Sequence, residues 1–252
     1  MNILVIGSNG QLGKCLKARV SCLSEDYKIY FFSKEQLDVR NLDKLEEVFL
    51  DTEPRFVINA SGFTNVDKAE ENFDDAIDVN GIGVKNISNF AKKNGSTLIH
   101  ISSDYVFDGL ANSPYKELDP TSPLGKYGES KLLGENYVIE SGCNYIILRT
   151  SWVFSEYGSN FLLTMIKLFN QKKSVSVIGD QIGCPTYAMD IASAIYKIIN
   201  NFEKQYSNEI YHFCGDSSVS WFNFAENILE EYSKINNNIQ VNIESIRTHE
   251  YR

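Results

Sequence analysis

The sequence lacks the features that mark secreted, membrane-bound and nucleic-acid-binding proteins. No stretch approaches the ~20 apolar residues of a membrane-spanning helix, and the first apolar run, residues 3–6, is too short for a signal peptide. Positive charge is also scarce, because 24 Lys and Arg stand against 33 Asp and Glu, a formal net charge of −9. Such a protein repels phosphate backbones and anionic lipids. We therefore expect no nucleic acid and no membrane among its partners, and a cytoplasmic location.

Cysteine and histidine are few and scattered. The five cysteines form no Cys-x-x-Cys pair and no metal-like cluster with the three histidines. Disulfide frameworks and zinc sites both show regular spacing, so the sequence predicts reduced thiols and no metal site. Internal repeats, low-complexity segments and an obvious linker are absent as well.

Short apolar runs alternate with longer amphipathic ones over the first two-thirds of the chain. The apolar runs predict strands at residues 2–7, 28–33, 55–61, 97–103 and 145–151, and the amphipathic runs predict helices at 11–23, 42–51, 74–95 and 127–141. Buried strands separated by helices are typical of a parallel sheet with both faces covered. The sequence thus predicts an α/β fold with a Rossmann-like, doubly wound parallel sheet over residues 1–151.

The alternation is looser beyond residue 151. The patterns predict helices at 159–171, 188–202 and 221–234, the last capped by Ser220, and strands at 174–180, 209–215 and 238–245. We interpret residues 152–252 mainly as a smaller lobe, with segments that return to the first domain.

Three evenly spaced glycines, Gly7, Gly10 and Gly13, lie between the first predicted strand and the first predicted helix. Glycine allows a tight turn there and lets backbone N–H groups approach a pyrophosphate. The start of the helix adds a partial positive charge. This loop predicts a dinucleotide site.

The end of the second predicted strand bears on which dinucleotide is bound. An acid at that position would bind the 2′-hydroxyl of NAD, and the strand ends instead on Ser33 and Lys34, which suit the 2′-phosphate of NADP. The sequence favours NADPH and leaves NADH possible.

A tyrosine and a lysine four residues apart occur twice, as Tyr30/Lys34 and Tyr127/Lys131. Only the second pair lies in a predicted helix, where such residues share a face. Reduction of a ketone needs a proton donor, and a free tyrosine has a pKa of about 10, which is high for that task. An ammonium group about 4 Å away would lower this pKa toward 7. Ser102 and Ser103 close a predicted strand, and a serine hydroxyl there would hold the carbonyl oxygen.

Longer motifs show a family resemblance. "GSNGQLG" (7–13), "HISSDYVFDG" (100–109), "YGESK" (127–131), "LRTSWVF" (148–154) and "DQIGCPTYAMDIA" (180–192) all contribute to it. The chain resembles the extended short-chain dehydrogenase/reductases and, among them, the family of dTDP-4-dehydrorhamnose reductases. The resemblance runs along nearly the whole chain.

The resemblance implies a role for each matching position. Ser103, Tyr127 and Lys131 would be catalytic, with Ser103 standing where the family usually has threonine. The nucleotide sugar would contact Ser103, Asp104 and Trp152. Three parts of the cofactor would contact the chain. The pyrophosphate would contact Gly7, Gly10, Gln11, Leu12 and Gly13, and the adenosine would contact Ser33, Lys34, Asp38 and Val39. The nicotinamide riboside would contact Gly62, Phe63, Thr64, Tyr127 and Lys131.

The implied reaction is reduction of the C4 keto group of dTDP-4-dehydro-β-L-rhamnose by NAD(P)H, in rhamnose and surface polysaccharide biosynthesis. Residues 152–252 would then mainly bind the nucleotide sugar. Family members continue past this C-terminus with a segment containing Arg-Pro, so the lobe would be shortened here, and a homodimer stays open. Two alternatives remain: a reductase or epimerase of another nucleotide sugar, and a non-catalytic NADP-binding subunit like the regulatory β subunit of methionine adenosyltransferase.

Overall fold

The computed structural model describes residues 1–202, 208–237 and 239–251. The chain divides into two compact units. The first consists of Met1–Thr150 and Ile191–Phe213, and the second of Ser151–Asp190 and Cys214–Arg252.

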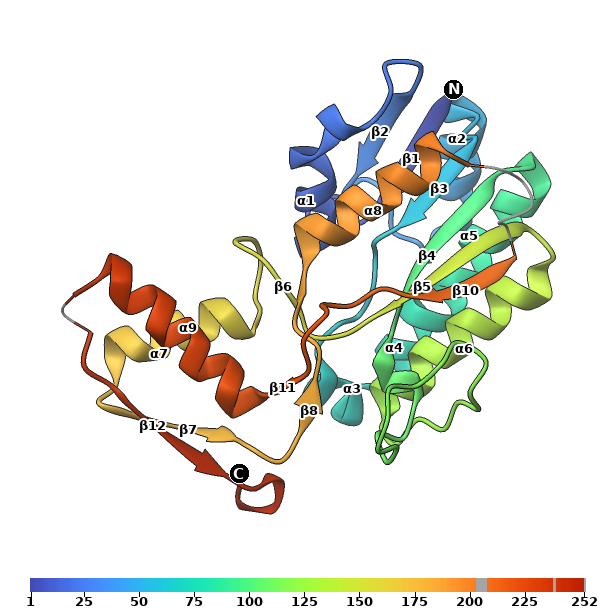
Figure 1. The fold of residues 1–252 in the computed structure, drawn as a ribbon. Coiled ribbons are helices and arrows are strands. Elements are labelled where there is room, and N and C mark those ends of the chain that lie inside the picture. The colour runs from blue at the N-terminus through green and yellow to red at the C-terminus, as the bar shows by residue number, and fades with distance from the viewer. Residues whose placement is uncertain (203–207, 238, 252) are drawn as a thin grey trace. The chain divides into compact units, whose positions relative to one another are not determined.

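A six-stranded parallel sheet forms the centre of the first unit (Figure 1). Every pair of neighbouring strands is parallel. In spatial order the strands are β10 (Glu209–His212), β5 (Asn144–Thr150), β4 (Thr97–Ser103), β3 (Phe56–Asn59), β1 (Asn2–Ile6) and β2 (Lys28–Phe32). The predicted doubly wound parallel sheet is confirmed.

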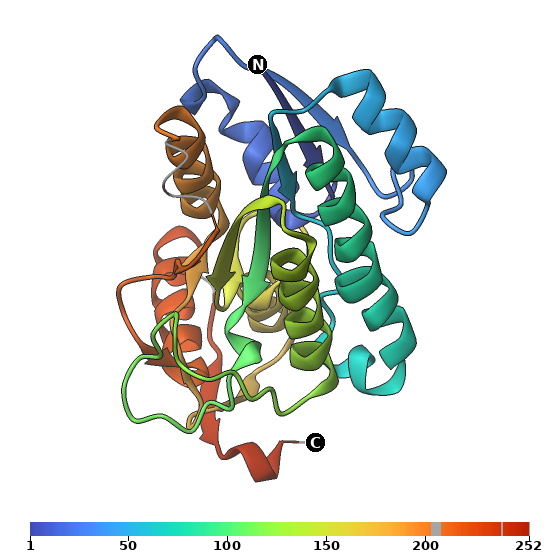
Figure 2. The same ribbon diagram turned by 90° about the vertical axis from the view of Figure 1, so that its right-hand side faces the viewer.

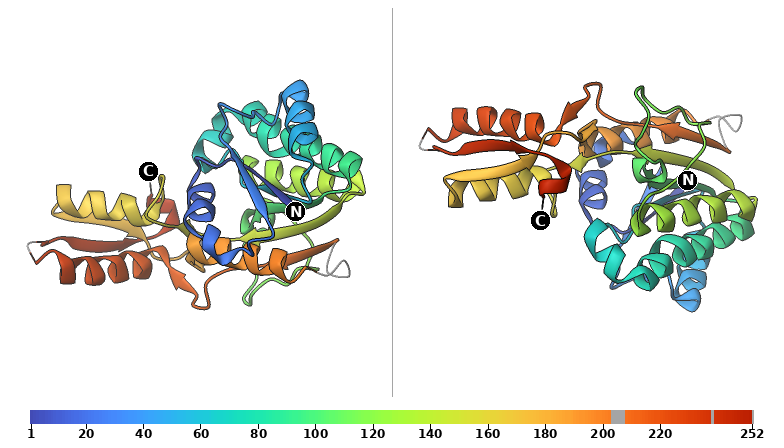
Figure 3. Two further views of the ribbon diagram at one scale, coloured as in Figure 1. Left: turned by 90° about the horizontal axis from the view of Figure 1, so that it is seen from above. Right: turned by 90° about the horizontal axis from the view of Figure 1, so that it is seen from below.

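Helices cover both faces of this sheet (Figures 2 and 3). One face carries α2 (Leu42–Thr52), α5 (Gly83–Asn94) and α6 (Lys126–Ser141), and the other carries α1 (Gln11–Ala18) and α8 (Ala188–Asn200). Shorter elements between them are η1 (Val20–Cys22), α3 (Val66–Glu71) and η3 (Asp104–Val106). The apolar strand residues pack against both helical layers, as Leu4 and Ile6 do on the first face. On the second face, Tyr196 of α8 donates its hydroxyl to the Leu16 carbonyl of α1.

The helix predicted at 74–95 is interrupted by a wider turn. It consists of α4 (Phe73–Ile77), the π turn η2 (Asp78–Ile82) and α5, and it ends, as predicted, at Gly95, whose φ is +66°. Turns of this kind are common at functional sites because they redirect one side chain. Here the turn places the buried Asn80.

The second unit is built on two helices and three short ladders. Its elements are β6 (Val153–Phe154), α7 (Phe161–Gln171), β7 (Ser174–Ile178), β8 (Ile182–Gly183), β9 (Thr186–Tyr187), β11 (Val219–Ser220), α9 (Trp221–Ile235), β12 (Asn242–Ile246) and η5 (Thr248–Glu250). β12 pairs with β7, β11 with β8, and β6 with β9. The Ser220 hydroxyl accepts a hydrogen bond from the Asn223 N–H, so the predicted cap is confirmed. The strand predicted at 238–245 begins only at Asn242, and residue 238 lies outside the described residues.

No helix within the described ranges is long and apolar enough to cross a membrane.

Candidate functional site

The glycine loop joins β1 to α1, where two of its residues have room only for hydrogen. Gly7 has a φ of +86°, and a Cβ there would lie 2.6 Å from the Ser61 nitrogen. A Cβ on Gly13 would lie 2.4 Å from the Gly7 carbonyl oxygen. Distances this short require glycine, because no rotation of a side chain would relieve them. The loop is therefore held close to the end of β3.

The N-terminus of α1 is open to a ligand. Gly10 is its N-cap residue, no side chain caps it, and its first turn carries no acidic residue. The first N–H groups of a helix lack partners within the helix, and the helix dipole makes them attractive to anions. These residues fit the pyrophosphate of a dinucleotide, with Gln11 and Leu12 forming the first turn.

The segment after β2 carries the predicted cofactor residues Ser33 and Lys34. Ser33 is buried, and its hydroxyl donates to a Glu35 carboxylate oxygen at 2.6 Å. This hydrogen bond lowers the pKa of Glu35. Glu35 is not among the residues predicted from the sequence, since an exposed acid two residues after Ser33 carries no signal of this contact. The Ser33 hydroxyl is thus already engaged, and Lys34 is exposed beside it.

Asp38 and Val39 follow in the same segment. Asp38 forms an ion pair with Arg40 at 2.6 Å, and its hydrogen bond from Arg40 lowers the pKa of Asp38 to about 2. Val39 is buried, and its carbonyl accepts a hydrogen bond from Asn86 of α5. The ion pair and this hydrogen bond fix the segment in which adenine contacts were predicted.

Asn80 connects two parts of the predicted site, and sequence reasoning missed it. Its side-chain oxygen accepts the Phe63 N–H at 2.8 Å, and its amide donates to the Phe63 carbonyl at 2.9 Å. The same amide donates to Ser130 of α6 at 3.0 Å. The loop Gly62–Thr64 is thereby tied to the helix that carries Tyr127 and Lys131.

Ser103, Tyr127 and Lys131 gather where β4 ends and α6 begins. Lys131 is buried, and its ammonium donates to the Ile101 carbonyl at 2.7 Å. The Ser103 hydroxyl donates to Asp104 at 3.1 Å. The Tyr127 ring packs edge-on against Tyr105, with centroids 5.3 Å apart.

Gly128 allows this close packing at the start of α6. A Cβ on Gly128 would lie 2.2 Å from the Tyr105 carbonyl oxygen, so only glycine lets the first turn of the helix reach η3. The sequence carries no signal that separates this glycine from an ordinary helix residue.

Burial controls the protonation of these side chains. It raises the pKa of Tyr127, against the opposing effect of a hydrogen bond with Ser103. Burial lowers the pKa of Lys131 to about 8, opposed by the negative charge of Glu135, and raises the pKa of Asp104 to about 6. The prediction that Lys131 brings the pKa of Tyr127 toward 7 is therefore wrong for this structure, because desolvation is the largest influence on the phenol and the charge of Asp104 raises its pKa as well. The phenol therefore stays protonated at neutral pH.

A buried ion pair holds the helix that carries Tyr127 and Lys131. Glu135, one turn after Lys131 on α6, accepts three hydrogen bonds from Arg149 of β5, the shortest at 2.7 Å. The Ser102 hydroxyl donates to the same carboxylate at 2.5 Å. Both charged side chains are at most 5% exposed. The pair fastens α6 to the two strands beside it.

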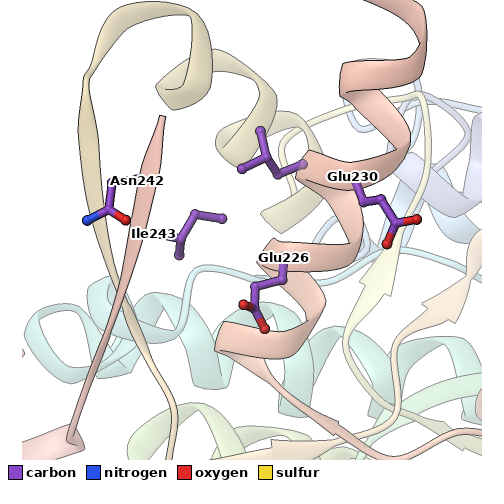
Figure 4. A pocket seen from close by; sticks show the side chains of 5 residues that line it. Glu226, Glu230, Asn242 and Ile243 are labelled. Carbon is purple, nitrogen blue, oxygen red and sulfur yellow. The ribbon is translucent and has the colours of Figure 1, made fainter. Parts of the chain in front are cut away.

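Trp152 belongs to the second unit, directly before β6. Its backbone is left-handed, with a φ of +46°, and its ring stacks on Trp221. None of the predicted site residues lines the pocket of about 320 Å³ between α9 and β12 (Figure 4). That pocket is bordered by Glu226, Leu229, Glu230, Asn242 and Ile243. Within the described part of the chain, no group of three or more His, Cys, Asp or Glu residues could hold a metal ion.

The parallel sheet, the open glycine loop and the Ser103–Tyr127–Lys131 group together define a short-chain dehydrogenase/reductase. The chain belongs to the RmlD substrate binding domain family, whose model matches residues 1–252.

Individual relatives agree with this assignment. A dTDP-4-dehydrorhamnose reductase from Aggregatibacter actinomycetemcomitans is 40% identical over 91% of this chain and 78% of its own. The spore coat polysaccharide biosynthesis protein SpsK of Bacillus subtilis is 36% identical over 99% of this chain and 84% of its own. A crystal structure of dTDP-4-dehydrorhamnose reductase from Bacillus anthracis, in complex with NADP, has a TM-score of 0.91 at 37% identity, covering 99% of this chain and 86% of that one.

Proposed function

We propose that this protein reduces the C4 keto group of dTDP-4-dehydro-β-L-rhamnose to the alcohol of dTDP-β-L-rhamnose, with NADPH as the reductant. The carrying observation is the pair of the half-buried Tyr127 and the buried Lys131 on the first turns of α6, beside Ser103 at the end of β4. Its relatives named as dTDP-4-dehydrorhamnose reductases support the choice of substrate.

The residues of this chain would divide the work as follows. NADPH, when bound, supplies the hydride that adds to C4. Tyr127 donates its phenolic proton to the oxygen that becomes the alcohol, and Ser103 hydrogen-bonds the same oxygen. Lys131 holds the nicotinamide ribose and stabilises the phenolate left behind. The sum consumes a ketone, NADPH and a proton, and it yields an alcohol and NADP⁺.

The remaining predicted contacts belong to the same proposal. The cofactor would lie along the glycine loop, Ser33–Lys34, Asp38–Val39 and the loop Gly62–Thr64, and the sugar would contact Asp104 and Trp152. Residues 152–252 would form most of the sugar-binding lobe. A homodimer in the cytoplasm without a nucleic-acid partner stays a prediction, which light scattering of the purified protein and fractionation of cells would check.

Activity should decline above about pH 8, because the pKa of Lys131 lies at about 8. Below this pH the side chain is a charged ammonium that stabilises the phenolate, and above it the amine is neutral and does not. The check is kcat/KM for NADPH measured across the alkaline range at saturating sugar, since this ratio reports ionisations of the protein before NADPH binds. A ratio that stays constant up to about pH 9.5 contradicts the role of Lys131.

Lys34→Ala should weaken NADPH and leave NADH nearly unchanged. Only NADPH carries a 2′-phosphate, and one exposed charge pair is worth up to ~1 kcal/mol, about a fivefold rise in KM. Steady-state kinetics with both cofactors measure this. Lys93→Ala is the matched control. Lys93 is also an exposed lysine, but it lies at the end of α5, where β4 is about to begin, and so at the amino ends of the strands and not at their carboxyl ends. Equal effects of Lys34→Ala on the two cofactors would remove Lys34 from the 2′-phosphate site.

The proposed function is tested by NADPH oxidation with dTDP-4-dehydro-β-L-rhamnose, generated from its precursor by the epimerase. Turnover with formation of dTDP-β-L-rhamnose is the expected result. NADPH binding without turnover of this sugar would overturn the substrate assignment. Turnover of a panel of other 4-keto nucleotide sugars would then separate a different reductase from a non-catalytic subunit.

A further inference from the structure

The two tryptophans of the chain form a stacked pair in the second unit. The ring centroids of Trp152 and Trp221 are 3.4 Å apart, and the ring planes differ by 6°. Trp221 begins α9 directly after the Ser220 cap, and its ring lies 4.5 Å from the Phe161 ring. Both Phe161 and Trp221 pack on the core between α7 and α9. One face of the Trp152 indole is thus covered by a ring that is anchored in the core.

Gly183 covers the opposite face. A Cβ on Gly183 would lie 2.2 Å from Cε2 of Trp152, 2.5 Å from Nε1 and 2.6 Å from Cζ2. Nε1 and Cζ2 are both bonded to Cε2, and a closest approach to the atom between them places this Cβ over the ring face and not beyond its edge. Trp221 already occupies one face at stacking distance, so the Gly183 backbone lies on the other.

The backbone around Trp152 is also held in place by its neighbours. Its φ of +46° is unusual for a bulky residue and persists only where the surroundings hold it. The Trp152 carbonyl accepts the Thr186 N–H at 3.2 Å, and the preceding Ser151 donates its hydroxyl to Cys184 at 2.7 Å. β8 carries Gly183 and pairs with β11, whose last residue caps the helix of Trp221. The segments that hold Trp152 are therefore connected to one another.

We propose that Trp221 is a positioning residue for the nucleotide sugar and acts through Trp152. With both faces covered, the partly exposed indole of Trp152 presents only its rim to a ligand. Aromatic rims carry a partial positive charge, so a fixed rim suits hydroxyl and keto oxygens and not the apolar face of a pyranose. This inference rests on the proposed function and on the contact of Trp152 with the sugar.

The test compares Trp221→Leu and Trp221→Phe with the unaltered protein. Trp221→Leu should lower kcat/KM for the nucleotide sugar by about 10- to 100-fold, since small displacements of a positioning group have effects of this size. A general loss of folding would change the kinetics with both substrates. The KM for NADPH is therefore the internal control and should stay within about twofold. Trp221→Phe keeps a stacking ring and should recover most of the loss.

A double-mutant cycle decides whether Trp221 acts through Trp152. Trp152→Leu should cause a loss like that of Trp221→Leu, and the double variant should be no worse than Trp152→Leu alone, whereas independent residues would give additive losses. The near-ultraviolet circular dichroism of the coupled indoles should disappear in each variant, including Trp221→Phe. Tyr232→Leu, near the other end of α9, is the control and should leave sugar kinetics unchanged.

Two results would overturn the inference while the unaltered protein remains active. One is kcat/KM for the sugar within about twofold of normal in Trp221→Leu, and the other is additive losses in the double variant. An unaltered protein that oxidises no NADPH with dTDP-4-dehydro-β-L-rhamnose would instead overturn the proposed function itself, and the inference with it.

Discussion

Tyr127→Phe is expected to lower kcat by at least about 1,000-fold while NADPH binding changes by less than about threefold. General acids contribute ~10²–10⁴-fold, and the larger part of that range applies here because no second donor replaces the phenol in the proposed reaction. Burial raises the pKa of Tyr127, so the phenol carries its proton throughout the neutral range, and Tyr127→Phe removes that proton. Loss of the hydroxyl leaves the ring and its contact with Tyr105 in place.

The measurement is single-turnover reduction of the sugar, with cofactor affinity determined separately by fluorescence titration. Tyr137→Phe is the matched control, since Tyr137 lies on the same helix and is similarly half-buried, and its ring lies under the Lys85 ammonium and not beside Ser103. Turnover retained by Tyr127→Phe within about tenfold would remove Tyr127 as the proton donor.

The fold was accessible from the sequence because its strands are short, apolar and bounded by turns. Residues 2–7 predict β1 to within one residue, and residues 74–95 predict the end of α5 to within one residue. The interruption of residues 74–95 was not accessible, since the π turn depends on contacts of Asn80 with Phe63 and Ser130, 17 and 50 residues away. Local patterns carry no information about such partners.

The candidate site divides in the same way. Tyr127 and Lys131 are recognisable because the helical period places them on one face, and Gly7 and Gly13 because a tight turn excludes other residues. The sequence predicted a lowered pKa for Tyr127, whereas the structure raises it, because this pKa depends on burial that only the fold determines. Glu135 has no local signal either, since a glutamate in an amphipathic helix ordinarily faces water.

Glu135→Gln is expected to lower the free energy of unfolding by about 3–5 kcal/mol. The substitution keeps the shape of the side chain but leaves the Arg149 guanidinium, only 5% exposed, without its counter-charge, and an uncompensated buried charge is among the most destabilising changes known. Urea unfolding measures the loss. Glu129→Gln on the same helix is the control: the Lys126–Glu129 pair has both side chains 41% exposed, and its loss should cost less than about 0.5 kcal/mol.

The double variant Glu135→Leu/Arg149→Met separates charge from packing. Removing both charges eliminates the unpaired guanidinium, so the double variant should be more stable than Glu135→Gln alone. It also gives a folded protein for comparison if Glu135→Gln does not fold. A loss below about 1 kcal/mol in Glu135→Gln would show that water reaches Arg149 and that the pair contributes little.

The same substitution reaches the proposed chemistry through Lys131. The charge of Glu135 raises the pKa of Lys131 against the opposing effect of burial, which leaves that pKa at about 8. Removal of the Glu135 charge should therefore lower the pKa of Lys131 below 8. The alkaline decline in kcat/KM for NADPH should then begin at a lower pH in Glu135→Gln than in the unaltered protein, measured where both remain folded. A purely structural pair would lower stability and leave this decline where it was. The joint outcome therefore distinguishes a support for the fold from a group that also keeps Lys131 charged.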